Sequence, residues 1–196
     1  AFIVKAGTII LLATIVIWFL QNISTSFEFV EFSNDSHSIL EAIGKTIAPI
    51  FTPTGFGHWT ATVATLSGLV AKEVVVSTFG VVAGLGDVGS EDPSMLEFAR
   101  SIFTPVSALS FMLFNQLCIP CFAATGAMRE EMNDKRWACF TLIYQSLFAY
   151  AVALMVYQFG SLLVLKTAPT VWTFIAGIVL LFMLYMLFRK PSVVKG

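Results

Sequence analysis

The run from Asn115 to Cys121, which reads Asn-Gln-Leu-Cys-Ile-Pro-Cys, holds the residue types best suited to chemistry in this chain. Pro120 has no N–H, and its ring clashes with the carbonyl four residues back, so the Gln116 carbonyl is predicted to lose its helical partner. Helical spacing places four polar or thiol residues along one stripe: Asn115, Cys118, Cys121 and Thr125. The sequence therefore predicts a broken helix with thiols and a bare carbonyl.

Such a break is typical of the ion sites of membrane transporters. Soft thiolates together with a carbonyl suit a late first-row divalent ion. Two other interpretations stay open. A cysteine can simply be a small buried hydrophobic residue, and the pair Cys118 and Cys121 can form a thiol–disulfide catalyst, although that motif usually opens a helix beside a βαβ unit. A structural zinc site would need another Cys or His pair, which the sequence does not contain.

Lys72 and Glu73 form the second candidate, in the middle of a long apolar run. Each ion at the centre of a bilayer costs roughly 2.5–3.5 kcal/mol. Sequence neighbours point about 100° apart on a helix, so the two need not pair with each other. We expect both to face protein, water or a substrate path, and a buried structural ion pair with other helices is the alternative to a gating role. The mixed-sign stretch 129–136 is interpreted as a solvated loop, with Glu130 kept as a candidate.

These candidates belong to a chain that is more apolar than a soluble domain. Of its 196 residues, 57% are hydrophobic and 12% are charged, whereas soluble domains carry about 25% charged residues. The net charge of −1 and the absence of a basic stripe give no support for nucleic-acid binding. A lipid bilayer is the expected solvent. No GxxxxGK[ST] or GxGxxG nucleotide-binding motif occurs.

Five segments are apolar and long enough to cross about 30 Å of hydrocarbon, near residues 2–20, 60–82, 102–121, 137–159 and 171–188. A sixth segment, 39–51, is too short to span as a regular helix and carries Glu41, Lys45 and Pro49. It is predicted to be a surface helix or a short broken or re-entrant helix. The predicted fold class is all-α, a polytopic transmembrane helix bundle that forms part of one transport domain.

The placement of lysine and arginine favours six crossings, with the short segment counted as one. Both chain ends then lie on the cytoplasmic side. The basic residues of that side are Lys5, Arg129, Lys135, Arg136, Arg189, Lys190 and Lys195, against Arg100 and Lys166 on the other side.

Two of these segments, together with the opening run, resemble a known family. Residues 62–78 resemble the AKEVVV-containing segment of the ferrous iron transport protein B family (FeoB), and residues 119–131 resemble the second of its two Pro-Cys gate motifs. Residues 4–20 resemble the segment between the two gates. The likeness covers nearly the whole chain in the right order.

This resemblance implies a membrane permease portion that passes Fe²⁺ inward and is not itself an enzyme. It implies that GTP and Mg²⁺ act through an N-terminal GTPase domain, which we expect, with the first gate, to lie outside these residues. Cys121 would be the gate cysteine that touches iron, Pro120 its helix breaker and Glu130 the acidic residue that closes the motif. Lys72 and Glu73 lie in the other recurring segment. Cys118 is not part of the family pattern.

The implied surroundings are a bacterial cytoplasmic (inner) membrane, the remainder of the FeoB polypeptide, small Feo accessory proteins and a homo-oligomer. Our hypothesis is that Cys121, the Gln116 carbonyl and Cys118 form a transient Fe²⁺ contact. Three rivals remain. One is a transporter of another solute, such as a nucleoside or an organic ion, on the same gate architecture. The others are a membrane thiol–disulfide oxidoreductase that uses Cys118 and Cys121, and a purely structural subunit.

Overall fold

The computed structural model describes residues 39–69, 72, 74–82, 93–132 and 134–189, and isolated positions before them (7, 8, 11, 12, 15, 16, 19 and 23). Within this part of the chain the backbone forms helices and no β-sheet. The predicted all-α fold class is therefore confirmed. The predicted segment 2–20 lies largely outside the described residues, as does Glu73.

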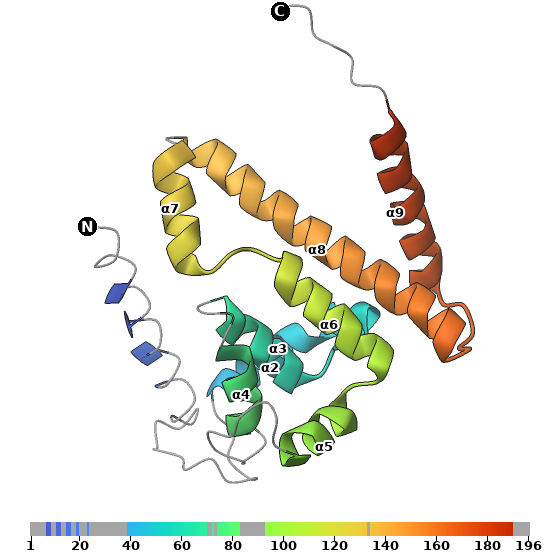
Figure 1. Ribbon diagram of the computed structural model, residues 1–196, viewed down its shortest axis with the longest axis horizontal. Coiled ribbons are helices and arrows are strands. Elements are labelled where there is room, and N and C mark those ends of the chain that lie inside the picture. Colours follow the sequence, from blue (N-terminus) through green and yellow to red (C-terminus); the bar gives the residue numbers. More distant parts are fainter. Residues whose placement is uncertain are drawn as a thin grey trace, which may run out of the picture.

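Eight α-helices and one 3₁₀ turn follow one another in the described chain (Figure 1). In order they are α2 Ile39–Phe51, η1 Thr52–Thr54, α3 Trp59–Gly68, α4 Val74–Val82, α5 Pro93–Ile102, α6 Pro105–Leu117, α7 Phe122–Met132, α8 Lys135–Val164 and α9 Val171–Phe188. The short predicted segment 39–51 has the same bounds as α2, and the predicted segment 171–188 has the same bounds as α9.

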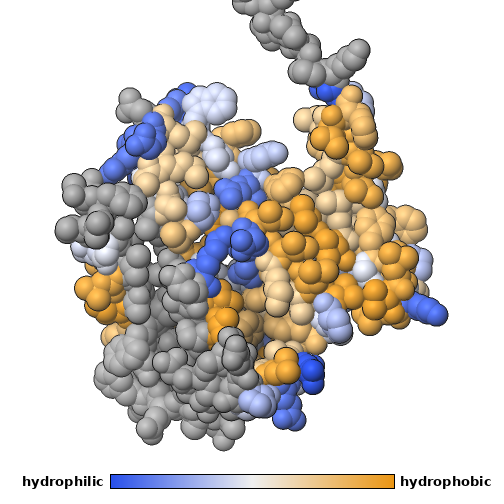
Figure 2. Space-filling view, in the orientation of Figure 1, coloured by the Kyte–Doolittle hydropathy of each residue, from blue (hydrophilic) through white to orange (hydrophobic). Residues whose placement is uncertain are grey.

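Among the described helices, α8 and α9 are the two that are long and apolar enough to cross a membrane. Their 30 and 18 residues extend about 45 Å and about 27 Å. Figure 2 shows hydrophobic residues over both helices and hydrophilic residues where α7 meets α8. Most large apolar side chains of α9 are exposed, which is the surface that lipid would cover. The chain is a membrane protein.

Two of the predicted spans are interrupted rather than continuous. In the segment 60–82, α3 ends at Gly68 and α4 begins at Val74, and the described residues between them, Leu69 and Lys72, lie in turns. The segment 102–121 contains α6, which ends at Leu117, before Cys118 and Cys121. Helix α6 begins where Thr104 and Ser107 cap its first turn reciprocally and Pro105 occupies the first helical position. Each interruption frees backbone groups that need partners in an apolar setting.

Aromatic rings hold the interrupted helices together. Phe111 of α6 contacts Phe56 at 5.4 Å, Phe79 at 5.6 Å and Phe103 at 5.1 Å between ring centroids. Phe51, at the end of α2, stacks on Phe56 at 5.1 Å. The core thus joins α2, α4 and α6 through one continuous set of ring contacts. Edge-on and offset ring pairs of this kind contribute about 0.5–1.5 kcal/mol each beyond their buried area.

Helix α8 supports this core from one side, and α6 lies along it (Figure 1). Ala149 and Ala153 of α8 are fully buried, and small residues allow two helix backbones to approach closely. Helix α8 also supplies side-chain donors to carbonyls of three neighbouring segments. These hydrogen bonds are Gln145 Nε2 to Cys118 O (3.4 Å), Tyr150 Oη to Ile50 O (2.8 Å) and Gln158 Nε2 to Pro53 O (2.8 Å).

Candidate ion gate at two interrupted helices

The first part of the site is the break between α6 and α7. The last turn of α6 closes with a 2.8 Å hydrogen bond from Cys118 N to Phe114 O, and Cys118 itself is extended (φ −66°, ψ 175°). Helix α7 starts again directly after Cys121, whose carbonyl accepts from Thr125 N at 2.9 Å. Pro120 lies between the two cysteines and has no N–H to continue the ladder. The backbone from Cys118 to Cys121 is therefore non-helical.

The two cysteines of the break have different environments. Cys118 is buried, 6% exposed, and its Sγ lies 3.6 Å from Asn115 O and 3.8 Å from Ile119 O. Cys121 is partly exposed. Neither is in a disulfide, and Cys139, which lies exposed on α8, is also a free thiol. The break thus presents one accessible thiol and one that is enclosed by carbonyl oxygens.

Side-chain donors from three different segments hydrogen-bond to carbonyls around the break. The three bonds are Lys72 Nζ to Gln116 O (3.1 Å), Gln145 Nε2 to Cys118 O (3.4 Å) and Thr125 Oγ1 to Pro120 O (3.2 Å). Pro120 cannot donate a hydrogen bond to the Gln116 carbonyl, and this carbonyl accepts from the charged donor, Lys72. A charged donor makes a stronger hydrogen bond than a neutral one.

Lys72 comes from the other interruption, between α3 and α4, and is 44 residues away from Gln116 in sequence. The fold therefore brings the two polar candidates of the sequence together at one place. A cation at the carboxyl end of α6 is electrostatically favourable, because the free carbonyls there carry partial negative charge.

The remaining predicted site residues are Asn115, Thr125 and Glu130. Asn115 is turned back on its own helix, with Nδ2 donating to Phe111 O at 2.9 Å. Thr125 lies one turn into α7, and its hydroxyl points back to the break. Glu130 is exposed on α7, eight residues after Phe122 and so roughly 12 Å farther along the axis. Glu130 is thus separated from the cysteines of the break.

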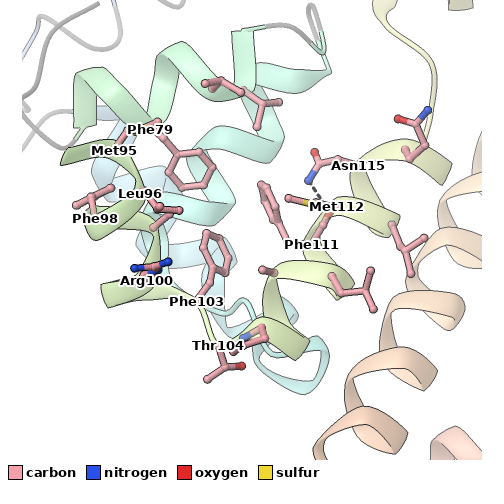
Figure 3. A pocket seen from close by; sticks show the side chains of 18 of the residues that line it. Phe79, Met95, Leu96, Phe98, Arg100, Phe103, Thr104, Phe111, Met112 and Asn115 are labelled. Carbon is pink, nitrogen blue, oxygen red and sulfur yellow. Dashed lines mark hydrogen bonds between the residues drawn. The ribbon is translucent and has the colours of Figure 1, made fainter. Parts of the chain in front are cut away.

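A cavity of about 850 Å³ lies beside the site, between α4, α5 and α6. Figure 3 shows Phe79, Phe103 and Phe111 grouped along it, with Asn115 and Thr104 at opposite ends of α6. Lys72, Asn115 and Gln116 line the end nearest the break. Most other lining residues are apolar, apart from Arg100 and Thr104, which lie towards the opposite end of α6 from Asn115 (Figure 3).

Within the described residues, no three His, Cys, Asp or Glu side chains lie close enough to hold a metal ion together. The potential metal ligands at the break are instead cysteine thiols and backbone carbonyl oxygens. Sequence reasoning missed Gln145, whose amide completes the set from α8. The available signal was a polar amide within the apolar segment 137–159, since such residues usually find a protein partner.

An all-helical membrane domain built around two interrupted helices is the class of protein that this fold and site define. Residues 3–135 match the family model described as "Gate: Nucleoside recognition". The chain belongs to this gate family, and relatives named Fe(2+) transporter FeoB confirm the resemblance noted from the sequence.

Three relatives illustrate the similarity. The chain is 36% identical to the Fe(2+) transporter FeoB of Methanocaldococcus jannaschii and 38% identical to that of Campylobacter jejuni, over 83% and 76% of this chain. It is 31% identical, over 81% of its length, to a protein of Porphyromonas gingivalis named as an Fe(2+) transport protein A/FeoB fusion. These matches cover 24%, 25% and 24% of the relatives, so the chain spans about a quarter of their length. No solved structure matches the chain.

Proposed function

We propose that this chain is the membrane permease portion of a ferrous-iron transporter and that Fe²⁺ passes the break between α6 and α7. The observation that carries the proposal is the gathering of Cys118, Cys121 and the Gln116 carbonyl at one interrupted helix. The Fe(2+) transporter names of the relatives support the choice of ion.

The chemistry of the break suits Fe²⁺ in transit. Thiolate and carbonyl donors can replace part of the hydration shell of a late first-row divalent ion. Conduction also requires that these contacts be weak enough for release. Cys121, the more accessible thiol, is assigned the first contact. Pro120 keeps the helix open there, and Asn115 and Thr125 line the approach.

The test is anaerobic ⁵⁵Fe²⁺ uptake by the full-length transporter in proteoliposomes, with Cys121→Ser compared with wild type. We expect Cys121→Ser to lose at least about tenfold in uptake at low micromolar iron, the factor for roughly 1.4 kcal/mol of lost transition-state binding. Cys139→Ser is the matched control, because Cys139 lies exposed on α8 outside the break, and it should transport like wild type. Wild-type uptake by Cys121→Ser would refute the proposal.

The same proteoliposome preparation distinguishes iron transport from two rival functions. A thiol–disulfide catalyst needs both cysteines to cycle, so Cys118→Ser would abolish activity as completely as Cys121→Ser. Under the transport proposal the first change is milder. The family description names nucleoside recognition, and a nucleoside transporter would show inhibition of uptake by nucleosides, whereas an iron transporter is inhibited by Mn²⁺.

We also propose the wider setting that the family implies. GTP hydrolysis in another part of the full-length polypeptide drives or gates the pore, and both ends of this chain face the cytoplasm of a bacterial cell. A small Feo protein is proposed as a partner, a choice supported by the fusion protein of Porphyromonas gingivalis. Comparing iron uptake with and without GTP, and mapping cysteine accessibility from each side, test these points.

A further inference from the structure

Lys72 occupies an unusual position between the two interruptions. Its backbone lies in the break between α3 and α4, while its ammonium reaches the end of α6 and donates to Gln116 O at 3.1 Å. A positive charge is therefore already present among the donors assigned to the transported ion.

A carbonyl freed by proline at the carboxyl end of a helix attracts cations. The Lys72 ammonium is such a cation, attached to the protein by a flexible four-carbon chain. A metal ion at the Gln116 carbonyl and the ammonium at the same carbonyl would repel each other strongly. The two cations must therefore occupy this position in turn.

We propose that Lys72 is a tethered cation that occupies the Gln116 carbonyl until a divalent ion displaces it. This inference rests on the proposed function and adds a specificity-determining residue to it. A monovalent ion offers no more charge than the ammonium it would have to replace, so displacement favours divalent ions. Displacement also breaks the link between the α3–α4 and α6–α7 interruptions, so that arrival of the ion releases one broken helix from the other.

The first test uses the unaltered full-length transporter. Reductive methylation labels free lysine amines, and mass spectrometry then reads the labelling rate at Lys72 with and without Fe²⁺ under anaerobic conditions. We expect Fe²⁺ to raise the rate at Lys72 about tenfold, the effect of losing one charge-assisted hydrogen bond. Lys45, which pairs with Glu41 on α2, is the internal control and should not change.

Equilibrium dialysis of ⁵⁵Fe²⁺ on the same sample distinguishes failure of the tethered-cation role of Lys72 from failure of the proposed transport function. Bound iron with an unchanged Lys72 labelling rate would overturn the tethered-cation role and leave the transport proposal standing. Absence of bound iron, together with wild-type uptake by Cys121→Ser, would overturn the proposed function and this inference with it.

The second test uses variants of Lys72 in the uptake assay. Lys72→Met removes the competing charge, so the KM for Fe²⁺ should fall about tenfold. Lys72→Arg keeps the charge and a donor and should keep KM within about twofold of wild type. A purely structural Lys72 would instead lower the maximal rate with KM unchanged, which would contradict the proposal. If Lys72→Met fails to fold, the labelling of the unaltered protein decides.

Discussion

Gly68 allows a sharp test of how closely the two interruptions must approach each other. It is the last residue of α3 and is buried. A Cβ at this position would lie 2.7 Å from Val75 Cγ2 of α4 and 3.5 Å from Asn115 Oδ1 of α6. The first distance is far below van der Waals contact, and the β-branched valine has little freedom to rotate away. Gly68→Ala must therefore shift α4, and with it the segment that carries Lys72.

The sign of the stability change separates this steric effect from helix propensity. Ala is favoured over Gly within a helix by up to about 1 kcal/mol. Overpacking costs about 1–3 kcal/mol, and the propensity gain is smaller at a helix end. We expect Gly68→Ala to lower the free energy of unfolding in detergent micelles by about 1–2 kcal/mol. It should also reduce Fe²⁺ uptake, because Lys72 is displaced.

Val75→Ala removes the atom that Gly68→Ala would meet, so it is the matched second variant. The double variant should be no less stable than Val75→Ala alone, which gives a coupling energy of about 1–2 kcal/mol between neighbours. A stabilised Gly68→Ala protein, or additive losses from the two changes, would refute the close approach of α3 and α4.

Three further predictions concern the segments around the gate. Gln158→Leu removes the donor to Pro53 O and the acceptor of the Thr170 and Thr173 hydroxyls, and should lower the free energy of unfolding by about 0.6–1.7 kcal/mol for each bond lost, measured by SDS titration; no loss would contradict a role for these bonds. Gly55→Ala should destabilise more, because φ at Gly55 is +85°, and a wild-type thermal midpoint would argue against that conformation. His58 Nδ1 accepts from Thr60 N at 3.4 Å to cap α3, and burial lowers the pKa of His58. Its contribution to stability is therefore complete above its unfolded pKa of about 6.5 and is lost as pH falls through the lower folded value. Unfolding measured at pH 8, 6 and 5 should show this loss in wild type and a smaller one in His58→Ala.

The sequence predicted helix content and the most apolar elements well, for a physical reason. Helix α9 has the predicted bounds because its apolar run ends at polar residues on both sides, and α2 likewise ends before the Thr-Pro-Thr turn η1. Helix α8 extends beyond the predicted 137–159, to 135 and 164. It starts at Lys135 because Asp134 caps its first turn through Arg136 N. A hydropathy window does not detect such a cap.

The sequence indicated one of the two helix interruptions clearly and the other only weakly. Pro120 marks the α6–α7 break, but no proline marks residues 69–73, where charge alone was the signal. Sequence reasoning also could not assign the donor that pairs with the Gln116 carbonyl, because Lys72 is 44 residues away and meets it only through the packing of α3 against α6. Contacts of this range depend on tertiary structure, so no local pattern encodes them.

The three donors of α8 also set distances along the axis of that helix. Gln145 and Gln158 are 13 residues apart, which corresponds to about 20 Å at 1.5 Å per residue. Since one holds the α6–α7 break and the other holds η1, these two segments lie at different depths if α8 crosses the bilayer. Gln145 is ten residues from the start of α8, about 15 Å and so half of the roughly 30 Å hydrocarbon thickness. The thiols would then lie near the midplane of the membrane, and the η1 turn would lie close to the opposite face.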